Sequence, residues 1–102
     1  MTRRPRLTSE EITARLNMIP GWTQTGERLE KKYRLPDFLQ ALAFVNTVGE
    51  AAEAAQHHPD ISIRYSLVTL QWWTWGSGGV TELDFELAAR CDQIYQALQG
   101  KA

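Results

Sequence analysis

The sequence is poor in the residues that build disulfides, cysteine-based metal sites and membrane spans. Its 102 residues include one cysteine, Cys91, which excludes an intrachain disulfide framework and a cysteine-based zinc cluster. No apolar run approaches the roughly 20 residues that a membrane-spanning helix needs. No apolar stretch follows the basic residues 1–6, as a secretory signal would require. We therefore expect a cytoplasmic protein with no membrane partner.

Net charge is also nearly absent. The formal charge is -1 at pH 7, so no global field draws the chain to nucleic acid or to an anionic membrane. The predicted strands are not basic, and their aromatic residues lack the neighbouring Lys and Arg of a single-strand binder. We expect no nucleic-acid partner. A chain of this length builds one core, so residues 1–102 are predicted to form a single domain with residues 1–6 flexible.

Hydrophobic periodicity and capping signals are present along the whole chain. Thr8 and Glu11 have the spacing of a capping box, and Pro59 forces the residue before it out of the helical region. The pattern predicts helices over residues 8–19, 36–57 and 81–99 and strands over residues 22–25, 28–35, 61–65 and 67–75. The order α-β-β-α-β-β-α predicts an α+β fold, a four-stranded antiparallel sheet with three helices packed on one face.

The aromatic residues and the cysteine divide between core and surface. Cys91 lies on the apolar stripe of the last predicted helix and is expected in the core rather than as a nucleophile. Trp22 and Trp72 are also expected in the core. Trp73 and Trp75 fall on the opposite strand face, where we favour an oligomer interface for Trp73 and a ring-stacking pocket for Trp75.

Both histidines of the chain are adjacent, at the predicted junction between the long helix and the next strand. His57 and His58 can exchange protons near neutral pH, because an ordinary imidazole titrates at about 6.5. Glu53 precedes His57 by four residues and would lie on the same helix face. Zinc needs a third strong ligand, and neither HxxxH nor HExxH spacing occurs, so we expect no metal. The residues themselves predict acid–base chemistry at this junction.

This constellation resembles the pterin-4a-carbinolamine dehydratases, known in animals also as dimerisation cofactors of a homeodomain transcription factor. The likeness covers nearly the whole chain and rests on a series of fixed spacings: Glu53-x3-His57-His58-Pro59-x5-Tyr65-x9-Trp75, followed by Asp84 within Gly-Gly-x-Thr-Glu-x-Asp. The resemblance implies a hydro-lyase that converts 4a-hydroxytetrahydrobiopterin to quinonoid dihydrobiopterin in tetrahydrobiopterin recycling. It implies no cofactor, because the pterin is the substrate.

The resemblance also assigns residues. The family's catalytic histidines fall at His57 and His58, its active-site aspartate falls at Asp84, and a third family histidine falls at Trp75, which cannot transfer a proton. Glu53, Tyr65, Trp75 and Asp84 are the predicted substrate-binding residues. Asp84 would orient a histidine or hold the amino-pyrimidinone edge of the pterin. A homodimer or homotetramer with sheets joined across subunits is implied as well.

Loss of hydroxide from a carbinolamine needs an acid at the leaving oxygen and a base at the ring nitrogen, which suits two imidazoles. We assign the acid to His57, paired with Glu53, and the base to His58; this division is a hypothesis, and the sequence supports the reverse nearly as well. The alternative function is a non-catalytic module of the same fold that binds a protein partner or assists assembly, which Trp75 in place of histidine would suit. An intact histidine pair favours the enzyme.

Overall fold

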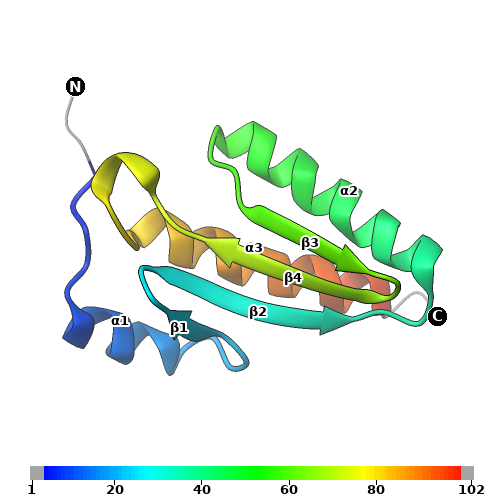
Figure 1. Cartoon of the computed structure of the whole chain (residues 1–102), viewed down its shortest axis with the longest axis horizontal. Helices are drawn as coiled ribbons and strands as arrows, with labels where there is room; N and C mark the ends of the chain where they lie inside the picture. Colours follow the sequence, from blue (N-terminus) through cyan, green and yellow to red (C-terminus); the bar gives the residue numbers. More distant parts are fainter. Residues whose placement is uncertain (1–3, 100–102) are drawn as a thin grey trace.

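The computed structural model describes residues 4–99, which form the predicted series of helices and strands. The elements are α1 (Ser9–Leu16), β1 (Thr23–Thr25), β2 (Arg28–Arg34), α2 (Phe38–Ala55), β3 (Asp60–Arg64), β4 (Leu67–Trp72), the 3-10 turn η1 (Trp75–Ser77) and α3 (Glu82–Gln99). The predicted order α-β-β-α-β-β-α and the α+β class are confirmed (Figure 1).

The four strands form one antiparallel sheet in the order β1-β2-β4-β3. The central pair β2 and β4 is in register at Leu29↔Trp72 and Tyr33↔Val68, and these four side chains are buried. Both α2 and α3 contact this face of the sheet and each other, as Figure 1 shows. The opposite face carries alternate residues of each strand and is open to solvent, because side chains of a strand point alternately to its two faces.

The core lies between the sheet and the helices. Its largest fully buried side chains include Trp72, Tyr33 and Phe44, and Trp22 and Cys91 are buried with them. The core positions predicted for Trp22, Trp72 and Cys91 are therefore confirmed. The first helix begins with the predicted capping box, since Thr8 Oγ1 accepts from the Glu11 amide and Glu11 Oε1 accepts from the Thr8 amide.

The strand predicted over residues 67–75 is shorter than expected. β4 ends at Trp72, and η1 follows it, closed by Gly78 in the left-handed region (φ 74°). An isolated antiparallel β-bridge pairs Thr74 with Gly79 on either side of this turn. Trp75 therefore projects from a 3-10 turn rather than from a strand, and it is 81% exposed.

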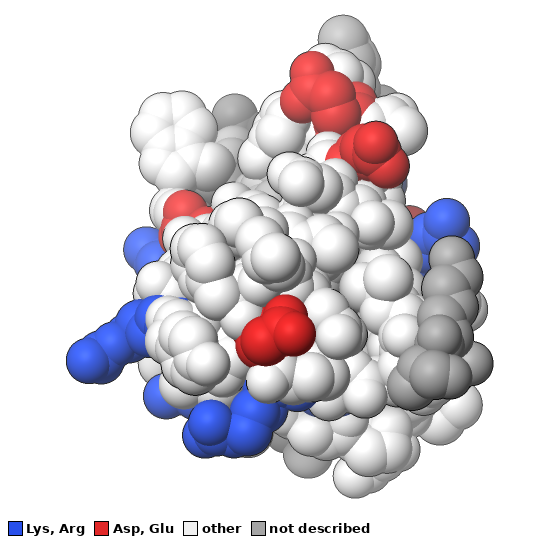
Figure 2. Space-filling view, turned by 90° about the vertical axis from the view of Figure 1, so that its right-hand side faces the viewer, with Lys and Arg blue, Asp and Glu red and all other residues white. Residues whose placement is uncertain are grey.

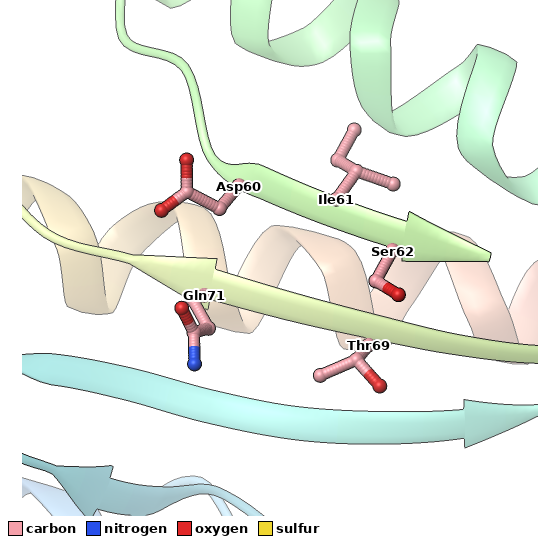
Figure 3. Close-up of a pocket in the computed structure, with 5 residues that line it drawn as sticks. All are labelled: Asp60, Ile61, Ser62, Thr69 and Gln71. Atoms are coloured by element: carbon pink, nitrogen blue, oxygen red, sulfur yellow. The ribbon is translucent and has the colours of Figure 1, made fainter.

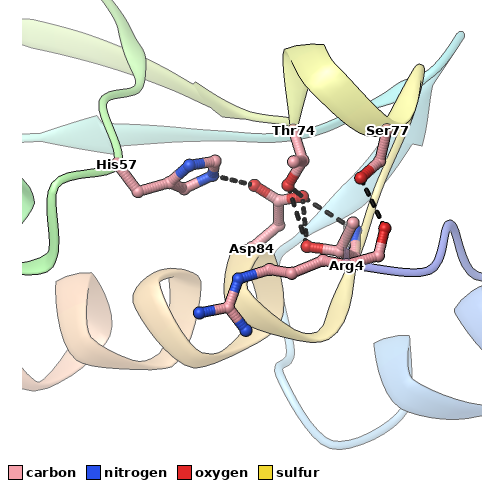
Figure 4. Close-up of polar contacts among 6 residues, drawn as sticks. Arg4, His57, Thr74, Ser77 and Asp84 are labelled. Carbon is pink, nitrogen blue, oxygen red and sulfur yellow. Dashed lines mark hydrogen bonds and ion pairs between the residues drawn. The ribbon is translucent and has the colours of Figure 1, made fainter. Parts of the chain in front are cut away.

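The segment that precedes α1 packs beside this turn. The backbone carbonyl of Arg4 accepts from Ser77 Oγ at 2.5 Å, and the Leu7 amide donates to the carbonyl of Val80 at 2.9 Å. Of residues 1–6, predicted to be flexible, residues 1–3 lie outside the described residues. Residues 4–7 thus run alongside the loop that carries Trp75 (Figure 4).

The two ends of the sheet differ in character. One end holds the β3–β4 turn and the start of α2, where Phe38, Leu39 and Tyr65 are exposed. Its surface is mostly uncharged (Figure 2). The other end holds the end of α2, the turn η1 and the start of α3 (Figure 1), and both histidines lie there. Within the described residues, no helix is long and apolar enough to cross a membrane.

Candidate active site

The histidines are placed by the way in which α2 ends. Gln56 adopts the left-handed conformation (φ 53°, ψ 41°), and its amide donates to the carbonyls of Ala52 and Glu53. The His57 amide donates to the carbonyl of Ala52 as well. This reversal ends the helix at Ala55, and with Pro59 four residues later the chain cannot resume it. His57 and His58 therefore lie on the short connection that leads into β3.

The ring of His57 contacts a buried carboxylate. Its Nε2 lies 2.6 Å from Asp84 Oδ1, and its ring stacks on Trp72 with centroids 5.7 Å apart and planes 18° apart. The His57 side chain is 13% exposed, and that of Asp84 is fully buried. Figure 4 shows the ring of His57 directed at Asp84 across the gap between the histidine segment and the start of α3.

Asp84 is itself fixed by the start of α3. Its Oδ2 accepts from the amide of Thr81 and from Thr74 Oγ1, both at 2.8 Å. The contact with the Thr81 amide satisfies a free backbone donor at the first turn of the helix. Both oxygens are engaged within the protein and the side chain has no exposed surface. The contact with His57 is compatible with the first of the two roles predicted for Asp84, and its role in substrate binding stays a prediction.

His58 has a different environment. Its Nε2 lies 2.7 Å from Glu53 Oε1, and the two side chains are 60% and 72% exposed. The prediction that Glu53 pairs with His57 is therefore wrong: the left-handed Gln56 turns His57 toward α3 and brings His58 back over the last turn of α2. Each imidazole has its own carboxylate, one buried and one solvated.

The two rings open onto one concave surface with a volume of about 330 Å³. It is lined by residues from the connection after α2, the start of β3, the segment after β4 and the turn η1: Gln56, His57, His58, Asp60, Trp73 and Trp75. This volume is at the lower end of the roughly 300–1,000 Å³ of small-molecule pockets. Trp75 and Trp73 both line this surface, while ring stacking by Trp75 and an interface role for Trp73 stay predictions.

Tyr65 is the one predicted site residue that the chain does not bring here. It lies in the β3–β4 turn with a positive φ of 55° and is 72% exposed. Five residues of β3 separate it from Pro59, and an extended strand rises about 3.3 Å per residue. Its role in substrate binding stays a prediction. The sequence reasoning missed Gln56, Asp60 and Trp73 as pocket residues, although Asp60 directly follows the His-His-Pro motif.

A second pocket, of about 190 Å³, adjoins the first on the open face of the sheet. It is lined by Asp60, Ile61, Ser62, Thr69 and Gln71 (Figure 3). Asp60 borders both pockets. Of the two pockets, the first alone is lined by imidazoles.

Fold and site together define a class: a small α+β protein in which carboxylate-paired histidines border an aromatic pocket. The sequence profile of the family described as Pterin 4 alpha carbinolamine dehydratase matches residues 5–94. The chain therefore belongs to the pterin-4a-carbinolamine dehydratase family, as its sequence motifs predicted.

Relatives agree with this assignment. A Koribacter versatilis protein provisionally named as a pterin-4-alpha-carbinolamine dehydratase is 49% identical over 89 residues, which are 87% of this chain and 95% of that protein. A similarly named Roseiflexus protein is 48% identical over 89 residues, which are 87% and 96% of the two chains.

Two solved structures share the fold. A transcriptional coactivator/pterin dehydratase from Brucella melitensis matches with a TM-score of 0.85 at 30% identity, covering 88% of this chain and 98% of that one. A pterin dehydratase-like protein described as a RuBisCO assembly factor of the alpha-carboxysome matches with a TM-score of 0.64 at 22% identity, covering 76% and 92%. The second likeness concerns the fold alone.

Proposed function

We propose that the protein is a hydro-lyase that dehydrates 4a-hydroxytetrahydrobiopterin to quinonoid dihydrobiopterin. The observation that carries the proposal is the pair of adjacent imidazoles on one pocket, each with a carboxylate on its Nε2. Membership of the family supports the substrate class. The same proposal places the protein in the cytoplasm, in tetrahydrobiopterin recycling, with no cofactor beyond the substrate.

The reaction requires two proton transfers. The C4a–O bond breaks and the hydroxyl leaves as water, so an acid must protonate its oxygen. N5 loses its proton to a base, and the electron pair of that N–H bond forms the C4a=N5 double bond. Because Nε2 of each ring is occupied by a carboxylate, Nδ1 is the nitrogen through which each histidine would act on the substrate.

We assign the acid to His57 and the base to His58. A cationic His57 keeps a hydrogen bond to the buried carboxylate of Asp84, whose charge compensates that of the imidazolium where water does not. The partner of His58 is solvated, and an exposed pair of this kind contributes little. His58 is therefore the ring better suited to receive a proton. The assignment is the one made from the sequence, with Asp84 in place of Glu53 as its physical cause.

The two tryptophans would hold the flat bicycle. Trp73 and Trp75 line the pocket beside the histidines, and aromatic faces stack on planar rings at centroid distances of about 4.5–7 Å. Trp75 occupies the place of a third family histidine, so proton transfer rests on two rings here. Glu53 would contribute to substrate binding indirectly, through its contact with the ring of His58.

We also propose a homodimer or homotetramer with sheets joined across subunits. β3 forms one edge of the sheet and pairs only with β4 within the described residues. An edge strand presents a row of backbone groups that another strand can pair with. Sedimentation velocity checks this: a species of 11.6 kDa at all concentrations would contradict it.

The second candidate is a non-catalytic module that binds a protein or assists assembly. Trp75 in place of histidine favours it, and the structural neighbour described as a RuBisCO assembly factor has the same fold. A module of this kind needs no proton-transfer groups, so the paired histidines favour the enzyme.

The deciding experiment follows the loss of the 4a-carbinolamine by ultraviolet absorbance, corrected for its spontaneous dehydration. His57→Ala and His58→Ala should each reduce the rate by roughly 10²–10⁴-fold, the usual contribution of a general acid or base. Glu50→Ala, which alters an exposed residue of α2 outside the pocket, serves as the control and should match the wild type. Equal rates in all four proteins would favour the non-catalytic module.

A further inference from the structure

The pocket needs an acceptor for the pyrimidine edge of a pterin. That edge presents two neighbouring donors, the 2-amino group and N3–H. Asp84, a sequence candidate for this contact, is fully buried with both oxygens engaged. Of the residues that line the pocket, Asp60 is the one with a carboxylate.

Asp60 stands at the rim of the pocket, on the open face of the sheet. It is the first residue of β3 and lies opposite Gln71 of β4, as Figure 3 shows. Arg28 of β2 donates from Nη1 to Asp60 Oδ2 at 3.0 Å and to Gln71 Oε1 at 2.8 Å. The guanidinium thus ties the start of β3 to the two central strands.

Arg28 also contacts the aromatic wall of the pocket. Its guanidinium carbon lies 4.7 Å from the centroid of the Trp73 ring. The ion pair with Asp60 is between exposed side chains, 40% and 60% accessible, and such pairs add little to stability. The arrangement is therefore better explained by orientation: one guanidinium fixes two pocket-lining side chains, an acceptor and a ring, relative to each other.

We propose that Asp60 recognises the 2-amino and N3–H donors of the pterin and that Arg28 is the positioning residue that holds Asp60 and Trp73 for this purpose. The inference rests on the proposed function. A carboxylate matches two parallel N–H donors, and each oxygen has two lone pairs, so Asp60 binds the ligand edge without releasing Arg28. Anchoring this edge at the rim turns the remainder of the bicycle, with C4a and N5, toward His57 and His58.

Gln56 supplies the one side-chain amide on the pocket. Its Nε2 donates to the carbonyl of Glu53 at 2.7 Å, which leaves a single amide oxygen for a ligand. One oxygen of an amide cannot accept two parallel donors as a carboxylate does. Asp60 is therefore the better match for the donor pair.

The test measures affinity by calorimetry for two probes: 7,8-dihydrobiopterin and its analogue with hydrogen in place of the 2-amino group. The wild type should bind dihydrobiopterin about tenfold more tightly than the analogue, as expected for one charge-assisted hydrogen bond in a partly solvated site. Asp60→Ala should bind both probes alike. Asp60→Glu, which keeps the carboxylate, should recover part of the discrimination.

Two further variants distinguish a direct contact between Asp60 and the ligand from a general effect of the polar side chains around Asp60. Arg28→Lys keeps the charge but not the planar fork, and it should raise KM for the carbinolamine several-fold while kcat changes less than twofold. Glu30→Gln is the matched control: Glu30 accepts from Gln71 Nε2 on the same face at 2.6 Å but does not line the pocket. Glu30→Gln loses one negative charge, as Asp60→Ala does, and should prefer dihydrobiopterin over the analogue to the same extent as the wild type.

The outcomes are distinct. The inference is overturned if Asp60→Ala still prefers dihydrobiopterin over the analogue as the wild type does, or if Glu30→Gln loses this preference to the same extent as Asp60→Ala. In either case the proposed function stands. An equal fall of kcat and kcat/KM in Arg28→Lys also overturns its positioning role. A wild type that binds neither probe and leaves the carbinolamine rate unchanged overturns both proposals together.

Discussion

Replacing Asp84 with asparagine tests the link between the start of α3 and the chemistry of His57. The change keeps the shape of the side chain but turns one acceptor into a donor. In the native protein Oδ1 accepts from His57, and Oδ2 accepts from the Thr81 amide and Thr74 Oγ1. In Asp84→Asn, the new NH2 must face either the ring of His57 or the Thr81 amide.

Both orientations have a cost that can be estimated. An NH2 facing Thr81 leaves two buried donors opposed, which costs about 1–3 kcal/mol of stability. An NH2 facing His57 forces the other ring tautomer and removes the compensating charge of the carboxylate. We therefore expect stability to fall by about 1–3 kcal/mol and the dehydration rate to fall by roughly 10²–10⁴-fold, the contribution of a well-placed acid.

Asp92→Asn provides the matched control. Asp92 lies two turns further along α3 and is 18% exposed. It accepts from Trp22 Nε1, from Lys31 Nζ at 2.8 Å and from Tyr33 Oη. Its replacement should lower stability to urea by a similar amount, yet the rate per folded molecule should equal that of the wild type.

The assay combines urea unfolding with the rate of 4a-carbinolamine loss and its pH dependence. A wild-type rate and pH profile in Asp84→Asn would refute the reasoning, because the buried carboxylate would then have no influence on the reacting ring. An equal loss of rate in Asp92→Asn would also refute it, since the loss would follow stability rather than contact with His57.

Three other residues give further predictions. Trp75→His, at an 81% exposed position, should raise turnover in the carbinolamine assay with a stability change within about 0.5 kcal/mol; lower turnover would contradict a proton-transfer role for that place in the pocket. Burial raises the pKa of the Cys91 thiol to about 12 from 9.0, so iodoacetamide at pH 7.5 should alkylate the urea-unfolded protein and leave the native one unmodified by mass spectrometry. Because the folded protein keeps this proton where the unfolded chain loses it, stability should be full below about pH 9 and decline toward pH 12. Thr8→Ala removes the capping hydroxyl of α1 and should cost about 1 kcal/mol in urea unfolding; an unchanged midpoint would show that α1 does not unfold with the core.

The fold was accessible from the sequence because its signals are local. The alternation in residues 28–35 and 67–72 marks strands with one buried face, and the capping pair of Thr8 and Glu11 marks a helix start. The end of β4 was misplaced because the pattern of Trp73 and Trp75 continues the strand alternation. The turn that interrupts it depends on the bridge between Thr74 and Gly79 and on the left-handed Gly78.

The site was predicted in composition but not in its contacts. The helix neighbour rule paired Glu53 with His57, whereas the left-handed Gln56 places His58 over Glu53 and directs His57 to Asp84. No sequence signal pointed to Arg28. Its approach to Asp60 and Trp73 arises from the register of β2 on β4, which pairing across the sheet determines.

The amino-acid sequence alone determined the helices, the strands and the adjacent histidines, because capping, periodicity and proline act over a few residues. Only the tertiary structure decided which carboxylate serves which imidazole and which side chains line the pocket. Asp84 is 27 residues from His57 and Asp60 is 32 residues from Arg28. Contacts at such separations exist only once the sheet and the helices have packed around their common core.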